Sequence, residues 1–125
     1  MTKILIVEDE PAIREMYRFK FSKDGFVVST AANGQLGFEA CEKEQPDLVL
    51  LDLKMPIMNG EDMLKKLRKT DWGANIRVIV LTNISKDEAP HNLRFLSVDR
   101  YIVKAHHTPA QVVNMVREVL NIEHA

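Results

Sequence analysis

The sequence predicts an α/β protein built on an open, doubly wound, five-stranded parallel sheet. Short aliphatic runs alternate with segments of helical period along the chain, and strands that are covered on both faces lose the polar alternation of exposed sheets. Strict alternation of strands and helices, joined by short connections, implies right-handed crossovers with helices on both faces of the sheet. Five such units are too few to close an eight-stranded barrel. An open sheet of this kind binds its ligands beyond the carboxyl ends of its strands.

Five short apolar runs supply the predicted strands. Four of them are clear, whereas the run at residues 27–31 is weaker and is expected to form an edge strand. All are far shorter than the roughly 18 residues that span a bilayer, and the first residues lack the layout of a secretory signal. We therefore expect a cytoplasmic protein without membrane insertion. The runs lie at residues 4–7, 27–31, 48–51, 78–81 and 101–103.

Segments of helical period follow the strands and predict five helices. The last is the best defined, because Thr108 and Gln111 have the spacing of a capping box and Pro109 occupies the first helical position. The fourth is the weakest, because Pro90 would lose a backbone hydrogen bond inside its first turns. It is expected to begin late, after a long mobile loop that starts at Ile84. The helices are expected at about residues 12–23, 34–44, 60–69 and 88–96 and from 109 onward.

The composition predicts one domain without a general affinity for nucleic acid. The chain has 125 residues, with 17 Lys and Arg against 18 Asp and Glu, and a formal net charge of -1. That length predicts a single domain over residues 1–125, and the charge supplies no positive field. The basic residues at positions 65, 66, 68 and 69 are expected to form a solvated helix face. The one cysteine, Cys41, is expected to be a small packed side chain.

Chemically active side chains stand at the carboxyl ends of four predicted strands. Crowded carboxylates repel one another unless a cation joins them, and oxygen ligands without His or thiolate favour Mg²⁺. One carboxylate is then able to attack a phosphoryl group, while an ammonium and a hydroxyl bind the oxygens of that group. The expected product is an aspartyl phosphate. The residues are Glu8, Asp9 and Glu10 after the first strand, Asp52 after the third, Thr82 after the fourth and Lys104 after the fifth.

These strand-end segments resemble the receiver domain of bacterial two-component response regulators. The resemblance covers nearly the whole chain, in the order and spacing of that family, and is closest to the single-domain receivers such as the chemotaxis regulators. It implies a flavodoxin-like (βα)5 fold with the strand order 2-1-3-4-5. The segments that carry it lie at residues 7–11, 51–56 with 59 and 60, 80–83, and 101–104.

The resemblance implies a role for each acidic residue. Asp52 is similar to the phosphoacceptor of the family. Glu8 and Asp9 are similar to the acidic pair that holds Mg²⁺ together with Asp52, with Asp9 bound more directly. The backbone carbonyl of Lys54 would complete the protein ligands of the metal. Mg²⁺ is thus the expected cofactor.

The resemblance also implies a phosphorylation switch. Lys104 is similar to the phosphate-binding lysine, and Thr82 to the hydroxyl that moves onto the phosphoryl group. Tyr101 is similar to the aromatic whose inward or outward rotamer follows that movement, although an amphipathic aromatic at a sheet edge is the alternative explanation for it. In the family, the altered surface is formed by the last two helices and the strand between them.

The resulting functional expectation is a signalling switch rather than an enzyme. A histidine kinase or histidine phosphotransfer protein would phosphorylate Asp52, and the chain would then contact a downstream protein, as a monomer or a phosphorylation-linked dimer. Its own chemistry would be limited to self-phosphorylation from small donors and slow autodephosphorylation. One alternative is the receiver portion of a longer DNA-binding regulator. Another is a small aspartyl phosphohydrolase like the haloacid dehalogenases, which would need a second Asp where Lys54 stands.

Four positions depart from the family pattern. Ala105 replaces the usual proline after the strand-five lysine, so either a strained cis peptide persists there or the loop follows another course. Asn83 replaces a small residue, and we hypothesise that it restricts access to the phosphorylation site. Lys54 and Ile84 offer no amide or carboxylate to orient a water, which predicts a long-lived phosphoryl state.

The first predicted helix carries two apolar stripes. One stripe, with Ile13, Tyr17 and Phe21, is expected to face the sheet. The other includes Met16 and Phe19 and has two explanations: it docks the helical bundle of a histidine kinase, as the family resemblance implies, or it simply extends the core. Ala12 and Lys23 belong to this second stripe.

Overall fold

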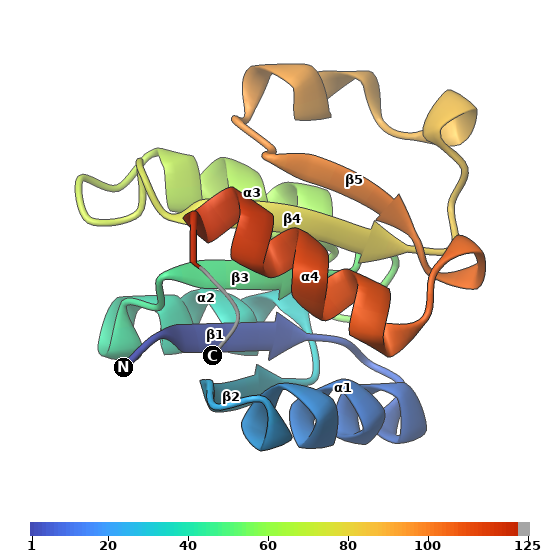
Figure 1. Cartoon of the computed structure of the whole chain (residues 1–125). Coiled ribbons are helices and arrows are strands. Elements are labelled where there is room, and N and C mark those ends of the chain that lie inside the picture. The colour runs from blue at the N-terminus through green and yellow to red at the C-terminus, as the bar shows by residue number, and fades with distance from the viewer. Residues whose placement is uncertain (123–125) are drawn as a thin grey trace.

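The computed structural model of the chain describes residues 1–122 and confirms the predicted doubly wound sheet. Five parallel strands pair in the order β2-β1-β3-β4-β5 (Figure 1), which is the order that the family resemblance implied. The edge position expected for the second strand is confirmed, and β5 forms the other edge. The strands are β1 (Lys3–Val7), β2 (Val27–Ala31), β3 (Leu48–Leu51), β4 (Arg77–Thr82) and β5 (Arg100–Val103).

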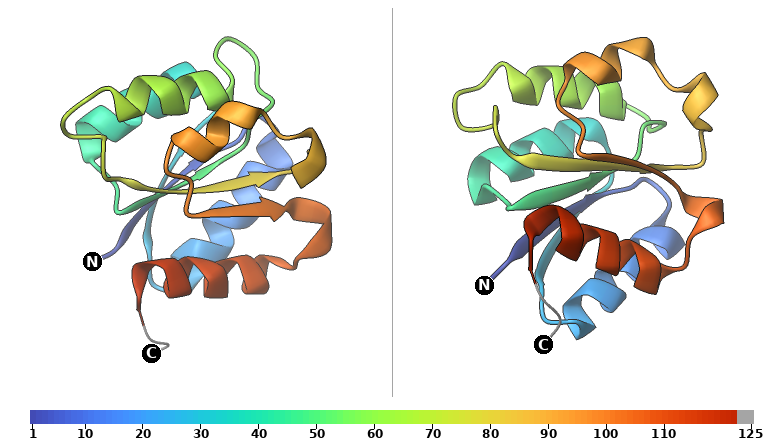
Figure 2. Two further views of the ribbon diagram at one scale, coloured as in Figure 1. Left: turned by 90° about the horizontal axis from the view of Figure 1, so that it is seen from above. Right: turned by 45° about the horizontal axis from the view of Figure 1, so that its top comes forward.

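Four α-helices cover the two faces of the sheet. Helices α1 (Pro11–Lys23) and α4 (Pro109–Leu120) lie on one face, and α2 (Gly34–Glu44) and α3 (Gly60–Arg68) lie on the other (Figure 2). Consecutive residues of a strand point to opposite faces, so Leu50 packs under α1 and α4 while its neighbour Leu51 packs under α2 and α3. Both side chains are buried, which explains why the strand sequences are apolar throughout.

Side-chain caps fix the starts of three helices. The carbonyl oxygen of the Asn33 side chain accepts a hydrogen bond from the Leu36 amide at 2.9 Å, and Asn59 caps α3 in the same way. At α4 the predicted capping box is confirmed, because Thr108 and Gln111 each accept a hydrogen bond from the other's backbone amide. These caps satisfy amides that have no partner within the helix.

The predicted fourth helix at residues 88–96 is wrong. Two short 3-10 turns, η1 (Lys86–Glu88) and η2 (His91–Phe95), take its place. Proline disfavours helical backbone in the residue before it, and Ala89 is extended, with φ of -65° and ψ of 146°, immediately before Pro90. Pro90 itself lacks the amide that a continuous helix would use. The expected long connection after Ile84 therefore contains η1, and its mobility stays a prediction.

The Arg68 guanidinium helps to fasten the end of this irregular segment to the rest of the fold. Arg68, the last residue of α3, donates hydrogen bonds to the carbonyls of Leu96 at 2.8 Å and Ser97 at 2.9 Å. It also donates to the carbonyls of Gly73 at 2.9 Å and Ile76 at 2.7 Å in the loop before β4. Burial lowers the pKa of the Arg68 guanidinium, partly offset by the negative charge of Asp99.

The basic face predicted on α3 is therefore only partly solvated. Arg68 is bound to backbone carbonyls instead, which contradicts the prediction for that residue. The Lys66 ammonium lies over the ring of Phe38, 4.4 Å from its centre. Lys69 is exposed, as expected.

The buried state of Cys41 confirms its predicted packing role. The side chain is fully buried within the core between the sheet and helices α2 and α3, and burial raises the pKa of its thiol to about 12. A thiol with so high a pKa is a weak nucleophile at neutral pH. Separately, no helix within residues 1–122 is long and apolar enough to cross a membrane.

Replacing Arg68 by Met is expected to lower the free energy of unfolding by about 3 kcal/mol, because several carbonyls lose a charged donor at once. Urea unfolding of wild type and Arg68→Met measures the difference. Lys69→Met is the matched control, since it removes an exposed cation from the next position and should change stability by less than about 0.5 kcal/mol. Equal effects of the two substitutions would contradict the fastening role of Arg68.

Candidate functional site

Strand register brings the predicted site residues to one edge of the sheet. Val7 of β1 pairs with Leu51 of β3, so the residues that follow them, Glu8 and Asp52, leave the sheet side by side. The Asp52 amide donates to the Val7 carbonyl at 3.0 Å and extends this pairing by one step. At the other end of the edge, Thr82 pairs with the last residue of β5, which precedes Lys104. The four side chains thus come from four different strand ends.

Three carboxylates gather at this edge. One oxygen from each of Glu8, Asp9 and Asp52 lies within 4.8 Å of the others. Glu8 and Asp52 are buried, with 3% and 7% of their surfaces exposed, whereas Asp9 is half-buried. An all-oxygen group of this size fits a hard cation such as Mg²⁺, and it lacks the His and thiolate ligands that zinc prefers.

The Asp52 carboxylate is held in one orientation by two donors. The amide of the following residue, Leu53, donates to its Oδ1 at 2.7 Å. The Lys104 ammonium donates to its Oδ2 at 3.1 Å. Both interactions are charge-assisted hydrogen bonds, which are the stronger class. The acidic side chain therefore presents a fixed carboxylate beside a fixed cation.

Lys104 joins the two buried acids electrostatically. Its ammonium also forms an ion pair with Glu8. Burial raises the pKa of Glu8, although the hydrogen bonds from Lys104 and from the Glu10 amide oppose that rise. Burial alone would lower the pKa of Lys104, but the hydrogen bond to Glu8 and the charge of Asp52 outweigh it, so its pKa is raised. The lysine stays protonated at neutral pH.

Arg14 supports the acidic loop and was not found by sequence reasoning. Its guanidinium donates to the carbonyl of Glu8 at 2.9 Å and approaches that of Asp9 at 3.5 Å. The bonds fix the backbone between β1 and α1, from which both acidic side chains extend. No motif marks Arg14, because a basic residue early in a helix is usually a solvent-exposed side chain.

A cavity of about 670 Å³ opens above these groups. Asp9, Asp52, Thr82 and Lys104 all contribute to its walls, which confirms that the strand ends share one space. Exposed Asn83 also borders it, consistent with the hypothesis that this residue controls access. The remaining lining residues come from the loops around the site: Glu10, Lys54, Met55, Pro56, Ile84, Ser85 and Glu88.

Thr82 and Tyr101 are connected through one residue. The Ile84 amide donates to the buried Thr82 hydroxyl oxygen at 3.4 Å, and the Tyr101 hydroxyl donates to the Ile84 carbonyl at 2.7 Å. Tyr101 is half-buried on the edge strand β5. Burial raises the pKa of its phenol, and the charges of Asp52 and Glu88 raise it further. The two predicted switch residues are thus in indirect contact.

The loop after Lys104 resolves the alternatives at Ala105. No peptide bond within residues 1–122 is cis. Residues Lys104–His106 form a 3-10 turn, closed by a hydrogen bond from the His107 amide to the Lys104 carbonyl at 3.3 Å. The loop therefore takes a different course from the one that a cis peptide would require.

Comparison with known proteins identifies the family. A family model described as the response regulator receiver domain matches residues 4–117. The chain belongs to this receiver-domain family. Its receiver fold is shared with a response regulator receiver domain protein from Methanospirillum hungatei JF-1, at a TM-score of 0.86 and 29% identity, over 97% of this chain and 94% of that one.

Two further relatives bear on the receiver site. Sporulation initiation phosphotransferase F of Bacillus subtilis is 46% identical over 80 residues, which are 64% of this chain and 63% of that protein. The response regulator TrrA of Thermotoga maritima, determined in complex with Mg²⁺ and BeF, is 29% identical with a TM-score of 0.82, over 95% and 99% of the two chains. The matches to the transcriptional regulators cover less than half of those proteins, for example 48% of one from Porphyridium aerugineum.

Mg²⁺ is expected to raise the melting temperature of this receiver domain, because an ion that binds the folded acidic cluster stabilises it by about 2.7 kcal/mol at a hundredfold excess over the dissociation constant. Asp9→Asn should lose most of that rise. Asp87→Asn, which removes an exposed carboxylate from η1 outside the cavity lining, should keep it. Thermal melts with and without Mg²⁺ provide the measurement. An equal rise in both variants would argue against metal binding at Asp9.

Proposed function

We propose that this receiver domain accepts a phosphoryl group on Asp52 from a phosphohistidine donor and signals by protein contact. The observation that carries the proposal is the placement of the Asp52 carboxylate. It borders an open cavity, with the Lys104 ammonium 3.1 Å from one of its oxygens and two further carboxylates beside it. A nucleophile, a cation for the transferred oxygens and an oxygen-ligand cluster are the parts that phosphoryl transfer requires.

The transfer itself is an in-line displacement at phosphorus. An oxygen of Asp52 bonds to the phosphorus of the donor as the phosphorus–nitrogen bond breaks, and the imidazole departs with that electron pair. The Lys104 ammonium and the Thr82 hydroxyl bind the phosphoryl oxygens on which charge is concentrated. The Leu53 amide, bonded to the other carboxylate oxygen at 2.7 Å, keeps Asp52 oriented during the attack.

Mg²⁺ is the proposed cofactor of this site. Glu8, Asp9 and Asp52 would hold it with the backbone carbonyl of Lys54, and their clustered oxygens fit a hard cation. When bound, the ion neutralises part of the acidic charge and binds phosphoryl oxygen. The complex of the Thermotoga maritima relative with Mg²⁺ and BeF supports this assignment by analogy.

The proposed switch runs from Thr82 to Tyr101. A phosphoryl group adds negative charge and strong acceptors next to Asp52 and would draw the Thr82 hydroxyl toward it. That movement breaks the long contact between the Thr82 hydroxyl and the Ile84 amide, and Ile84 also holds the Tyr101 hydroxyl. Phosphorylation thereby favours one rotamer of Tyr101 over the other.

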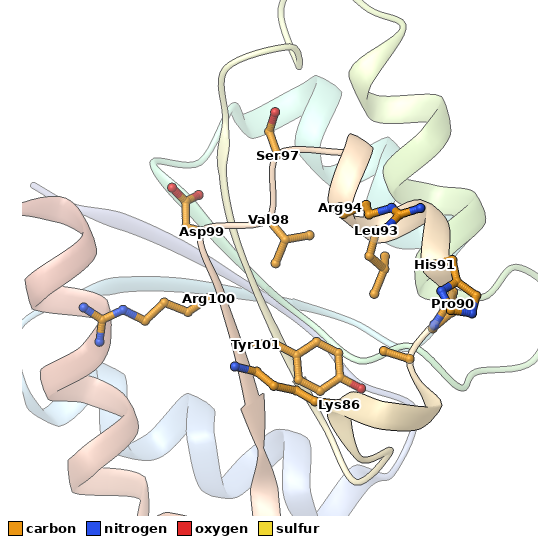
Figure 3. Close-up of a pocket in the computed structure, with 11 residues that line it drawn as sticks. Lys86, Pro90, His91, Leu93, Arg94, Ser97, Val98, Asp99, Arg100 and Tyr101 are labelled. Atoms are coloured by element: carbon orange, nitrogen blue, oxygen red, sulfur yellow. The ribbon is translucent and has the colours of Figure 1, made fainter.

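A pocket beside Tyr101 is the proposed place of contact with a downstream protein. The pocket of about 590 Å³ lies between η2 and β5 and is lined by the apolar side chains of Leu93 and Val98 as well as the Tyr101 ring (Figure 3). Phe95, at the end of η2, is 73% exposed. Since the predicted fourth helix is replaced by turns, the output surface of this chain is built from η2, β5 and α4.

The outer stripe of α1 is the proposed docking surface for the phosphodonor. Met16 and Phe19 are 45% and 64% exposed, so the alternative that they extend the core is wrong. Tyr17 and Phe21 are buried against the sheet, as expected. Two exposed apolar side chains on the helix that follows Asp9 would meet a helical bundle brought to Asp52.

The other functional hypotheses differ in what they require of the chain. A receiver portion of a longer DNA-binding regulator would have the same chemistry at Asp52, and the partial coverage of the transcriptional relatives is compatible with it. A phosphohydrolase would need turnover of a small phosphorylated substrate, and Lys54 stands where the acid of haloacid dehalogenases is expected. We therefore propose a phosphoacceptor whose own catalysis stops at self-phosphorylation from small donors and slow loss of the phosphoryl group.

Incubation with acetyl phosphate and Mg²⁺ is expected to add one phosphoryl group to wild type and none to Asp52→Asn, as measured by intact mass. Asp71→Asn is the matched control, because Asp71 is an exposed acid in the turn that follows α3. Its labelling should equal that of wild type. Labelling of Asp52→Asn at the wild-type level would contradict the assignment of Asp52 as the phosphoacceptor.

Asn83→Ala is expected to lose its phosphoryl group several-fold faster than wild type, because a smaller residue at the cavity border admits water more readily. Dephosphorylation after removal of acetyl phosphate measures both rates. Ser85→Ala, at another exposed position on the same cavity, should keep the wild-type rate. Equal rates for Asn83→Ala and wild type would count against the access hypothesis.

Wild type itself should retain the label for minutes or longer, because neither Lys54 nor Ile84 offers an amide or carboxylate to orient a water. Loss of the label within seconds would contradict this prediction.

A further inference from the structure

Ile57 occupies an unfavourable backbone conformation with its side chain in solvent. Its φ is 69°, and 83% of its surface is exposed. The other non-glycine residues with positive φ within residues 1–122 are Gln45, Ser97 and Asn121, none of which is β-branched. The left-handed region is a genuine outlier for a β-branched residue, since its Cβ crowds the backbone. Neither conformation nor packing therefore explains why this position holds isoleucine.

The neighbours of Ile57 prevent the strain from relaxing. The Met58 amide donates to the Pro56 carbonyl at 2.7 Å, which closes a three-residue turn around Ile57. The Met58 carbonyl accepts a hydrogen bond from Gly34 at 2.8 Å, and a Cβ on Gly34 would lie only 2.5 Å from that oxygen. On the other side, a Cβ on Gly60 would lie 2.2 Å from the Asp52 carbonyl oxygen. Two glycines thus allow the loop to be clamped in this shape.

The clamped loop is a wall of the phosphoacceptor cavity. It follows Asp52 directly along the chain, and Met55 and Pro56 line the cavity while the next residue, Ile57, extends into solvent. A protein that carries a phosphohistidine to Asp52 must place its own surface over this wall. A small donor such as acetyl phosphate enters the cavity without covering Ile57.

We propose that Ile57 is an apolar contact that the phosphodonor protein buries, and that it sets which donors this receiver accepts. The inference rests on the proposed phosphotransfer to Asp52. Because the turn holds the side chain in place beforehand, docking loses little conformational freedom at this position. Strain persists where surrounding structure imposes it, and such sites concentrate at functional surfaces. An isoleucine retained there at a cost to stability fits a side chain kept for a partner.

The test compares stability and two kinds of phosphorylation in Ile57→Asn and Ile57→Gly. Asparagine and glycine tolerate positive φ better than isoleucine, so either substitution relieves the backbone strain. Both variants should therefore melt at roughly 4 °C or more above wild type. Labelling by acetyl phosphate should be unchanged. Transfer from the phosphorylated histidine kinase or phosphotransfer protein that labels wild type fastest in a purified panel should fall about tenfold or more, which corresponds to one buried isoleucine.

Val27→Thr is the matched control, because Val27 is also an exposed β-branched residue, 43% accessible, but starts the edge strand at the opposite end of the sheet. Its transfer rate should equal that of wild type. Unchanged transfer to the Ile57 variants would overturn the inference, as would an equal loss with acetyl phosphate, which would mean a distorted site. The inference would also be overturned if no donor protein in the panel labelled wild type. Labelling by acetyl phosphate would in that case still support Asp52 as the phosphoacceptor. Failure of acetyl phosphate to label wild type would instead refute the proposed function.

Discussion

The contact of the Lys104 ammonium with Glu8 and Asp52 is the interaction on which the functional edge of the sheet depends. Two buried carboxylates side by side would repel each other or take up protons if no cation joined them. Lys104 follows β5, which does not pair with β1 or β3. Its side chain therefore reaches across the end of β4 and joins the end of β5 to the ends of β1 and β3, with which β5 does not pair directly.

Ile84 has a comparable position between the site and the surface. Its amide and its carbonyl belong to the same residue, yet one contacts Thr82 at the cavity and the other holds Tyr101 at the sheet edge. A displacement of Thr82 thus acts on a residue that Tyr101 already uses as its hydrogen-bond partner. In the proposed switch, this shared residue would couple the Thr82 side of the cavity to Tyr101 at the sheet edge, which spatial proximity alone would not do.

Local patterns predicted the strands, the capping box at Thr108 and the acids at the strand ends, because each of these depends on residues close together in the sequence. The fourth helix failed since the proline at 90 outweighed a helical periodicity that was weak from the start. Arg14 and Arg68 were missed for another reason: they bind backbone carbonyls, which every residue has, and no residue pattern marks an acceptor of that kind. The strain at Ile57 likewise depends on close approaches to Gly34 and Gly60 that only the folded chain shows.

Arg68 binds the residues that follow a segment with little regular hydrogen bonding of its own. Within the segment from η1 to η2, backbone hydrogen bonds are confined to single 3-10 turns, whereas β4 and β5 on either side belong to the sheet ladder. We therefore expect that opening of this segment costs less free energy than unfolding of the sheet. The proposed output surface is accordingly expected to be a weaker cooperative unit, which can be remodelled while the carboxyl edge of the sheet, with Asp52, keeps its geometry.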